Sequence, residues 1–148
     1  MNAAADLAGE LAASFAGAWN QHDMDALASL FHEDAGFVNV RGAYLTGREQ
    51  IRAQHAAVHA GPYKDSVVRV EVIDSKELAP DVVVAHVRTR LDGDNRTPGQ
   101  TQHSVVTFVI ERRDGLWLFA AAQNTFVSPR LAKEATRYLC RMAPGEPA

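Results

Sequence analysis

The chain has 148 residues, which suits one domain and leaves little room for a second. Apolar residues make up 47% of the chain and charged residues 22%, so a full hydrophobic core can form. The 15 basic and 18 acidic residues give a formal net charge of -3, and no run of Lys or Arg supplies the basic face that nucleic-acid binding requires.

The cysteine count and the N-terminus bear on the compartment. A single cysteine, Cys140, precludes an intramolecular disulfide. Residues 1–10 lack the basic start and apolar run of a secretory signal, and no apolar stretch approaches membrane-spanning length. We therefore expect a cytoplasmic protein with no membrane partner.

The N-terminal part of the chain predicts two helices. Asn20-Gln21-His22-Asp23 separates them, and Asp23 can cap the second helix. The apolar residues at helical spacing are Leu7, Leu11, Phe15, Ala18 and Trp19 in the first helix, and Met24, Leu27, Leu30 and Phe31 in the second.

A short strand and a third helix follow. Residues 35–40 read as the strand, and Thr46-Gly47-Arg48-Glu49 has the form of a capping box that begins the helix. The apolar face of this helix carries Ile51, His55 and Val58, and Gly61-Pro62 ends it.

The remainder alternates with the period of strands. The predicted strands are residues 66–73, 82–91, 101–111 and 116–127. Asp114-Gly115 predicts a hairpin between the last two, and Ser128-Pro129 can begin a final helix over about 129–141. Helices gathered before an antiparallel meander favour an α+β fold, with one domain over 1–148 and a core over about 7–127.

These segments resemble the NTF2-like superfamily, in particular its SnoaL-like and SgcJ/EcaC-type branch. The motifs that carry the resemblance are Trp19-Asn20-Gln21-His22-Asp23, Leu30-Phe31-His32-Glu33-Asp34-Ala35, Gly47-Arg48-Glu49-Gln50-Ile51, Gly115-Leu116-Trp117 and Gln123-Asn124-Thr125. The resemblance implies three helices packed on a strongly curved, mainly antiparallel sheet, a pocket inside this cone, and a homodimer formed through the outer sheet face. Because the family includes ketosteroid isomerases, polyketide cyclases, dehydratases and binding modules, the fold alone does not choose a function.

Strand alternation predicts which side chains face the pocket. With a two-residue turn at Asp114-Gly115, Glu111 faces Leu118 and Thr107 faces Ala122. One face then shows Val105, Thr107, Val109, Leu118, Ala120, Ala122 and Asn124, and the other shows Val106, Phe108, Ile110, Trp117, Phe119, Ala121 and Gln123. The small residues of the first face favour it as the pocket wall, and the aromatics of the second favour a subunit interface. A one-residue slip would exchange the two sets.

Comparison with ketosteroid isomerase supports that choice and limits the chemistry. The resemblance puts that enzyme's catalytic carboxylates on Asn39 and Thr107, its helix Tyr on Phe15, a second active-site Tyr on His55 and a pocket aromatic on Asn124. Asn39 cannot accept a proton and Phe15 cannot donate to an oxyanion, so steroid isomerisation of that kind is excluded.

Seven residues form the predicted site. The catalytic candidates are His55 and Asn39, and the ligand-binding candidates are Phe15, Thr107, Asn124, His103 and Tyr44. Five candidates also have a structural interpretation: His55 as a core histidine, the two amides as ties between strands, and Thr107 as a strand-former. His103 can lie with Thr89 at the pocket mouth or be a solvated strand-end histidine.

Other chemistries lack support in the sequence. His55 and His59 have a metal-compatible spacing, but Ala56 stands where a zinc protease has its Glu and a third ligand is missing. Neither a nucleophile motif nor a phosphate loop occurs, so we predict no metal and no cofactor. The alternating residues His86, Arg88 and Arg90 fit a dimer contact or solvation better than an anion site.

The residues and the resemblance lead to three hypotheses, in which the biosynthetic setting is what the SgcJ/EcaC-type resemblance implies. The first is an NTF2-like protein of natural-product biosynthesis, of polyketide or enediyne type, that binds an apolar or polyketide-like ligand and catalyses cofactor-free cyclisation, isomerisation or dehydration. The second is a non-catalytic module that binds a ligand or a partner, and the third is an assembly or scaffold role.

Overall fold

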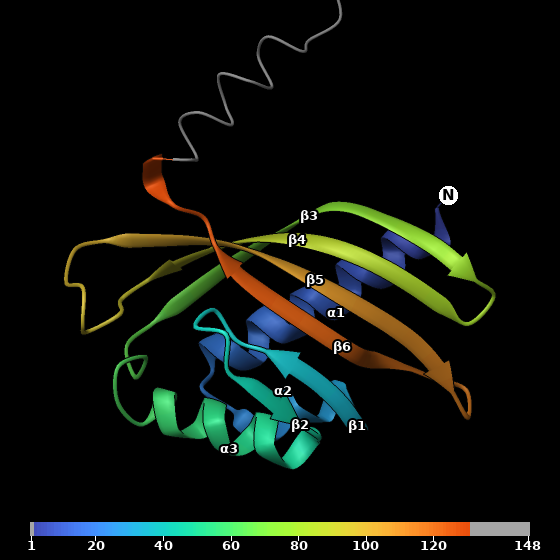
Figure 1. Cartoon of the computed structure of the whole chain (residues 1–148), viewed down its shortest axis with the longest axis horizontal. Helices are drawn as coiled ribbons and strands as arrows, with labels where there is room; N and C mark the ends of the chain where they lie inside the picture. The colour runs from blue at the N-terminus through green and yellow to red at the C-terminus, as the bar shows by residue number, and fades with distance from the viewer. Residues whose placement is uncertain (1, 131–148) are drawn as a thin grey trace, which may run out of the picture.

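The computed structural model describes residues 2–130, in which helices precede the long strands (Figure 1). The helices are α1 (Ala3–Asn20), α2 (Met24–Ser29) and α3 (Arg48–His59). The strands are β1 (Phe31–Val38), β2 (Tyr44–Thr46), β3 (Val67–Ala79), β4 (Val82–Asp92), β5 (Thr101–Arg113) and β6 (Leu116–Phe126). This arrangement confirms the predicted α+β class. The predicted final helix, from residue 131 onward, lies outside the described residues.

The strands form one six-stranded sheet in the order β2-β1-β6-β5-β4-β3. Only the β1–β6 pair is parallel among the described strands; the other pairs are antiparallel. The long strands arch over α1, while α3 lies beside the short strands β1 and β2 (Figure 1). β3 extends six residues beyond its predicted end, because its second half pairs with β4 as far as Ala79 opposite Val82.

The segment between α1 and α2 fixes the helices to the sheet. Asp23 caps α2 by accepting from the Ala26 N–H, as predicted. The Asn20 amide donates to the Val68 carbonyl at 3.0 Å and accepts from the Val68 N–H at 2.7 Å. Since both polar atoms of Asn20 are used, this motif residue joins the end of α1 to the edge strand β3.

The start of α3 is confirmed, but its cap is not the predicted one. Gly47 is the N-cap, with φ +86° and no side-chain cap bond, and the Gln50 side chain accepts from the Thr46 N–H at 2.9 Å. The Arg48 guanidinium donates two hydrogen bonds, of 2.9 and 2.7 Å, to the Phe31 carbonyl. Arg48 thereby anchors to β1 the helix that carries His55.

A bulge in β6 corrects the predicted sheet faces. Glu111 pairs with Leu118 as expected, but the register shifts beyond Ile110–Phe119, so that Val109 pairs with Ala121 and Ala120 has no partner. Thr107 consequently pairs with Gln123 rather than with Ala122. On β5 the inner residues are Ser104, Val106, Phe108 and Ile110, and on β6 they are Phe119, Ala122 and Asn124.

Thr107 was therefore predicted on the wrong face. The β-strand pleat sends successive side chains to opposite sides, and Phe108 is buried against the helices, so Thr107 lies on the outer face. Asn124 lies on the inner face as predicted, because the extra residue at Ala120 reverses the alternation along β6.

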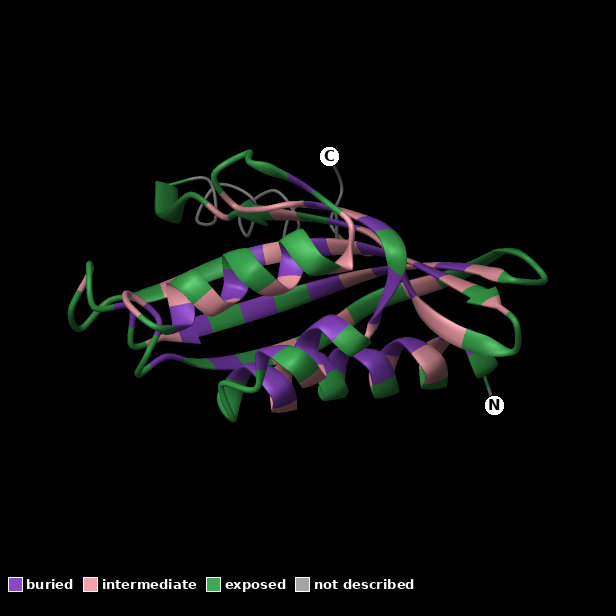
Figure 2. Ribbon diagram, turned by 90° about the horizontal axis from the view of Figure 1, so that it is seen from below, coloured by how far each residue is buried: buried purple, intermediate pink, exposed green. Residues whose placement is uncertain are grey.

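Four phenylalanines fill the space between α1 and the sheet, and we call them the aromatic plug. They are Phe15, Phe31, Phe108 and Phe119. Phe108 and Phe119 stack with ring centroids 4.1 Å apart, and Phe15 meets the other three edge-on. Burial along the strands and the facing helices marks this core (Figure 2). Phe108 and Phe119, which were predicted at a subunit interface, are thus core residues on the helix-covered face, whereas Trp117 is half-buried and packs against this core.

Replacing Arg48 should destabilise the fold more than replacing its neighbour Arg52. We expect Arg48→Met to lower the free energy of unfolding by about 1–3 kcal/mol, because the Phe31 carbonyl loses a charged donor. Arg52→Met removes an exposed, solvent-screened pair with Glu49 and should change the free energy of unfolding much less. Urea unfolding of both variants measures the difference, and equal losses would contradict the anchoring role.

Candidate functional site

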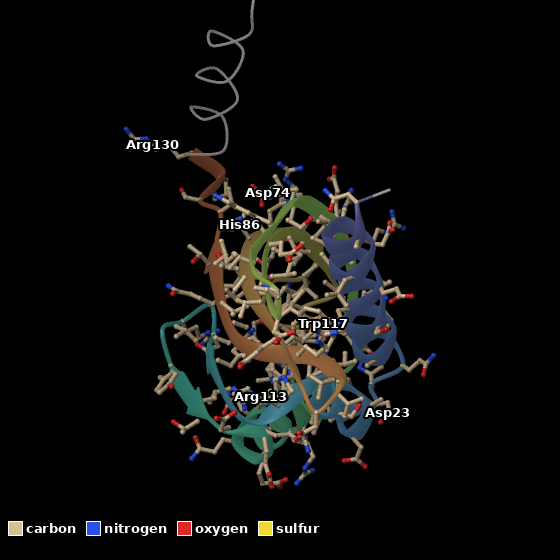
Figure 3. All side chains as sticks on the ribbon, turned by 90° about the vertical axis from the view of Figure 1, so that its right-hand side faces the viewer. Asp23, Asp74, His86, Arg113, Trp117 and Arg130 are labelled. Carbon is tan, nitrogen blue, oxygen red and sulfur yellow. The ribbon has the colours of Figure 1, made fainter. Side chains whose placement is uncertain are left out.

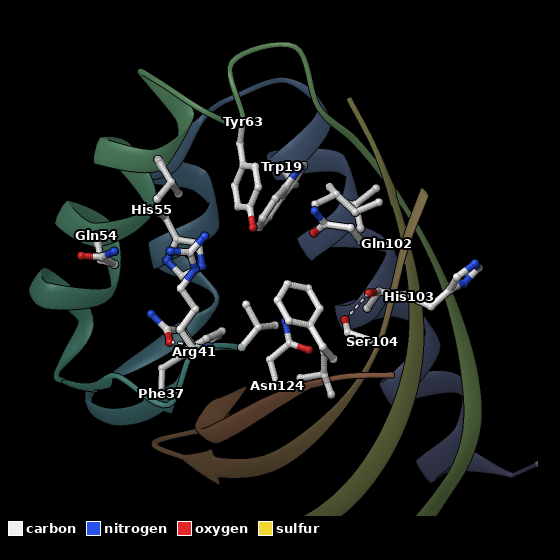
Figure 4. A pocket seen from close by; sticks show the side chains of 18 of the residues that line it. Trp19, Phe37, Arg41, Gln54, His55, Tyr63, Gln102, His103, Ser104 and Asn124 are labelled. Atoms are coloured by element: carbon white, nitrogen blue, oxygen red, sulfur yellow. Dashed lines mark hydrogen bonds between the residues drawn. The ribbon is translucent and has the colours of Figure 1, made fainter. Parts of the chain in front are cut away.

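A cavity of about 160 Å³ opens between α1, α3 and the inner face of the sheet (Figure 4). Its apolar lining consists of Phe15, Trp19, Phe37, Val40, Val58, Tyr63, Val68, Leu91, Val106 and Phe126. Its polar lining consists of Asn39, Arg41, Gln54, His55, Thr89, Arg96, Gln102, His103, Ser104 and Asn124. An apolar cavity of about 150 Å³ accommodates a benzene ring, so the enclosed space suits a ligand with one ring.

His55 presents an unprotonated nitrogen to this cavity. Its Nδ1 lies 2.7 Å from the Ile51 carbonyl oxygen, one turn earlier in α3. Because a carbonyl only accepts, Nδ1 carries the proton and Nε2 keeps its lone pair. Nε2 has no hydrogen-bond partner among residues 2–130. Burial lowers the pKa of His55 below its usual range, so the ring is neutral at pH 7.

The β4–β5 loop forms one wall of the cavity through a buried carboxylate. Asp94, which is only 3% exposed, accepts two hydrogen bonds from the Arg96 guanidinium and one from the Gln102 amide nitrogen. The hydrogen bonds from the Arg96 side chain have the largest effect on this carboxyl group, and together these bonds lower the pKa of Asp94 to about 2. Arg96 in turn lies over the Tyr63 ring, 5.1 Å from its centroid. The loop is therefore a fixed part of the site.

The two predicted amides occupy different situations. The Asn39 Oδ1 accepts from the Arg41 and Ala43 N–H groups at 3.0 Å each, so it organises the β1–β2 turn while the residue borders the cavity. The Asn124 Oδ1 is buried without a partner in the described part of the chain. Its position is consistent with a polar contact to a ligand, whereas Asn39 has a structural task.

Five of the seven predicted residues border one cavity, namely Phe15, Asn39, His55, His103 and Asn124. Thr107 does not, because it lies on the outer face. Tyr44 is 64% exposed and its ring lies against the backbone of Gly36, outside the cavity. The His103 side chain is at the rim and points away from the centre (Figure 4). Their functional roles remain predictions.

Several wall residues of the cavity were not predicted from the sequence. Trp19 was predicted as a helix and motif residue but not as part of the site; its indole N–H donates to Ser66, and its ring lies beside that of His55. Gln102 and Ser104 lie on the inner face, and Ser104 bonds to Thr89 at 2.5 Å. Their spacing of two along a strand was the available signal, since it puts both on one face.

Outside the cavity, the alternating residues of β4 are paired with acids. His86 bonds to Asp74 at 2.7 Å on the outer side of the sheet (Figure 3), and Arg88 and Arg90 pair with acidic residues of β3 and β4. Across residues 2–130, no cluster of three metal-ligating side chains occurs. Nor does any helix of that region have the length and apolarity to cross a membrane.

Two further histidines, His22 and His59, form a pair near His55. The Nδ1 atoms of His22 and His59 are 2.7 Å apart, so a proton on one is shared with a lone pair on the other. His59 packs edge-on against Trp19 with ring centroids 4.4 Å apart. Burial, followed by the proximity of His22 and His55, lowers the pKa of His59 to about 4.

The comparisons with known proteins identify the family. The chain belongs to the SnoaL-like domain family, whose sequence profile matches residues 11–119. The NTF2-like resemblance of the sequence is thereby confirmed, and solved structures of the same fold are described as NTF2-like or cystatin-like. No curated protein matches the chain in sequence.

Three solved structures illustrate the fold. An uncharacterised protein from Caulobacter vibrioides with a cystatin-like fold is 27% identical, with a TM-score of 0.82 over 93% of this chain and 99% of that one. A ketosteroid isomerase-like protein from Erwinia carotovora atroseptica is 14% identical, with a TM-score of 0.73 over 87% and 100%. A type 2 hexachlorocyclohexane dehydrochlorinase (LinA) is 18% identical, with a TM-score of 0.72 over 85% and 86%.

The buried histidines should make stability fall in mild acid. Their pKa is lower in the folded chain than the usual 6.5, so their contribution is complete above pH 6.5 and is lost as the pH falls, for His59 down to about 4. Each histidine should add a slope of up to about 1.4 kcal/mol per pH unit in this window. In urea unfolding between pH 7 and 4, His59→Leu should flatten the curve, and an unchanged slope would contradict the assignment.

Proposed function

We propose that this protein binds a small, largely apolar molecule in the cavity and transfers a proton on it, without a cofactor, with His55 as the base. The observation that carries the proposal is the hydrogen bond from the Nδ1–H of His55 to the Ile51 carbonyl. This bond leaves the Nε2 lone pair at the wall of a largely apolar cavity. A neutral, desolvated imidazole at pH 7 is suited to take a proton from carbon. Asn124 and the Tyr63 hydroxyl are available to orient polar groups of the ligand.

The reaction class follows from this single base. Nε2 takes a proton from a carbon atom, and the electron pair of the broken C–H bond forms a double bond. In the isomerisation of an unsaturated ketone, the carbonyl π pair moves onto oxygen as this double bond forms, and the C=O bond is restored when Nε2 returns the proton to another carbon. In an elimination, a leaving group on the adjacent carbon departs with its bonding pair, and Nε2 releases the proton to solvent. The described lining contains no carboxylate to perform the same step.

The relatives support proton-transfer chemistry of this kind. The ketosteroid isomerase-like protein and the hexachlorocyclohexane dehydrochlorinase are similar in fold, and the second acts on a molecule with one six-membered ring. We extend the proposal to natural-product biosynthesis in the cytoplasm, the setting indicated by the SgcJ/EcaC-type resemblance and the lone cysteine. A polyketide-sized ligand would extend through the open side, where Arg41 and Arg96 are exposed.

A non-catalytic binding module is the second candidate. Two observations favour it: the Asn39 oxygen is occupied by its own turn, and His55 has a backbone carbonyl rather than a carboxylate behind Nδ1. A carbonyl stabilises the imidazolium that forms after proton transfer less than a carboxylate does. The module therefore predicts binding without conversion.

Replacing His55 separates the two candidates. With 3-cyclohexenone as the probe, wild type should form the conjugated 2-cyclohexenone, and His55→Gln should lower kcat by about 100- to 10,000-fold while KM changes little. The acid limb of kcat/KM should have its midpoint below pH 6.5, because burial lowers the pKa of His55. Ultraviolet absorbance of the conjugated ketone measures both.

Arg52→Met, on the exposed side of α3, serves as the matched control and should retain wild-type turnover. Equal turnover by wild type and His55→Gln would refute the base role. Saturable binding of the ketone by wild type with no product above the buffer rate would instead establish the binding module.

We also propose a homodimer through the outer sheet face. Half-exposed apolar residues gather there on β4, β5 and β6, at Val84, Val109, Leu118 and Ala121. Sedimentation should give about twice the mass of one chain, and Val109→Lys should give a monomer because it places a charge in the apolar contact. Ser14→Lys on α1 should stay dimeric; a wild-type monomer at micromolar concentration would contradict the proposal.

A further inference from the structure

The cavity has an unbalanced charge that the proton-transfer proposal does not use. Its lining contains two arginines, Arg41 and Arg96, and no aspartate or glutamate. This is notable in a chain with 18 acidic and 15 basic residues. A cavity lined by one sign of charge with apolar walls concentrates ligands of the opposite sign.

The two arginines differ in their partners. Arg96 makes a bidentate ion pair with the buried Asp94 carboxylate, so its charge is balanced. Arg41 makes no ion pair and no side-chain hydrogen bond with any residue between 2 and 130, and its side chain extends from the β1–β2 turn toward the cavity (Figure 4). Arg41 is therefore the uncompensated cation of the site.

The turn that carries Arg41 is held in place. The Asn39 side chain accepts the Arg41 N–H and the Ala43 N–H, and the Asn39 N–H donates to the Ala43 carbonyl. Gly42, with φ +82°, completes the turn in a conformation that favours glycine. The backbone that carries the Arg41 side chain is thus held in place, which lowers the entropic cost of binding a ligand through the guanidinium.

We infer that the natural ligand is a small ring compound with one carboxylate, which Arg41 binds at the mouth while the ring enters the cavity. This inference rests on the proposed function only in placing the ligand in the same cavity. A planar guanidinium matches a carboxylate with two parallel hydrogen bonds. A single uncompensated positive charge suits a monoanion. The ring packs against Trp19, Phe37 and Phe126, with its reacting C–H turned toward His55.

Benzoate and benzamide test the inference, because they have the same ring and nearly the same shape but differ in charge. By isothermal titration of the full chain at low salt, wild type should bind benzoate about 10- to 100-fold more tightly than benzamide, the range expected for a charge-assisted pair. Arg41→Gln should abolish the preference, and Arg41→Lys should restore part of it. Arg69→Gln, the same charge change on an exposed β3 residue, should keep the preference.

The outcomes are distinct. Equal binding of benzoate and benzamide by wild type, or an unchanged preference in Arg41→Gln, overturns the inference and leaves the proposed function intact. Tighter binding of phenyl phosphate than of benzoate overturns the assignment to a carboxylate. Failure of all these probes to bind contradicts both proposals. An Arg41-dependent preference for benzoate supports the inference even where 3-cyclohexenone is not converted.

Discussion

The bulge at Ala120 is the constraint on which the site depends. In a regular strand, side chains on one face are an even number of positions apart, so Phe119 and Asn124 would point to opposite faces. The one unpaired residue in β6 lets both face the same side. Phe119 then stacks on Phe108 in the aromatic plug, and Asn124 reaches the cavity. The plug fills part of the space under the sheet, and the cavity lies next to it, bordered by Phe15 and His55.

The electrostatics of the cavity follow from two buried groups, His55 and Asp94. Desolvation keeps His55 neutral, and the hydrogen bond to Ile51 decides which nitrogen holds the proton. Asp94 keeps its charge because Arg96 and Gln102 bind it, so this carboxylate of the β4–β5 loop is already paired. The groups left for a ligand include the neutral base, the Asn124 oxygen and the Arg41 guanidinium, which has no partner among residues 2–130.

The helices and the last hairpin could be predicted because their signals are local. The 3.6-residue spacing around Phe15 and the Asp114-Gly115 turn depend on neighbours in the chain. The bulge could not be predicted: residues 120–122 are all alanine, so an extra residue leaves no trace in their polarity. Asn124 was correctly predicted on the inner face because two errors cancelled: the wrong face was chosen for β5, and the bulge in β6 was missed. Thr107 lies on β5, where only the first error acts. Arg41 was missed because a turn residue reaches a cavity only through tertiary packing.

Measuring which tautomer His55 adopts tests the proposed base most directly. In nitrogen-15 spectra of histidine-labelled protein, with His55→Gln used to assign the signals, His55 should be neutral at pH 7 with the proton on Nδ1, and its titration midpoint should lie below pH 6.5. A His55 ring with its proton on Nε2, or an imidazolium at pH 7, would show that no lone pair faces the cavity and would contradict the proposed base.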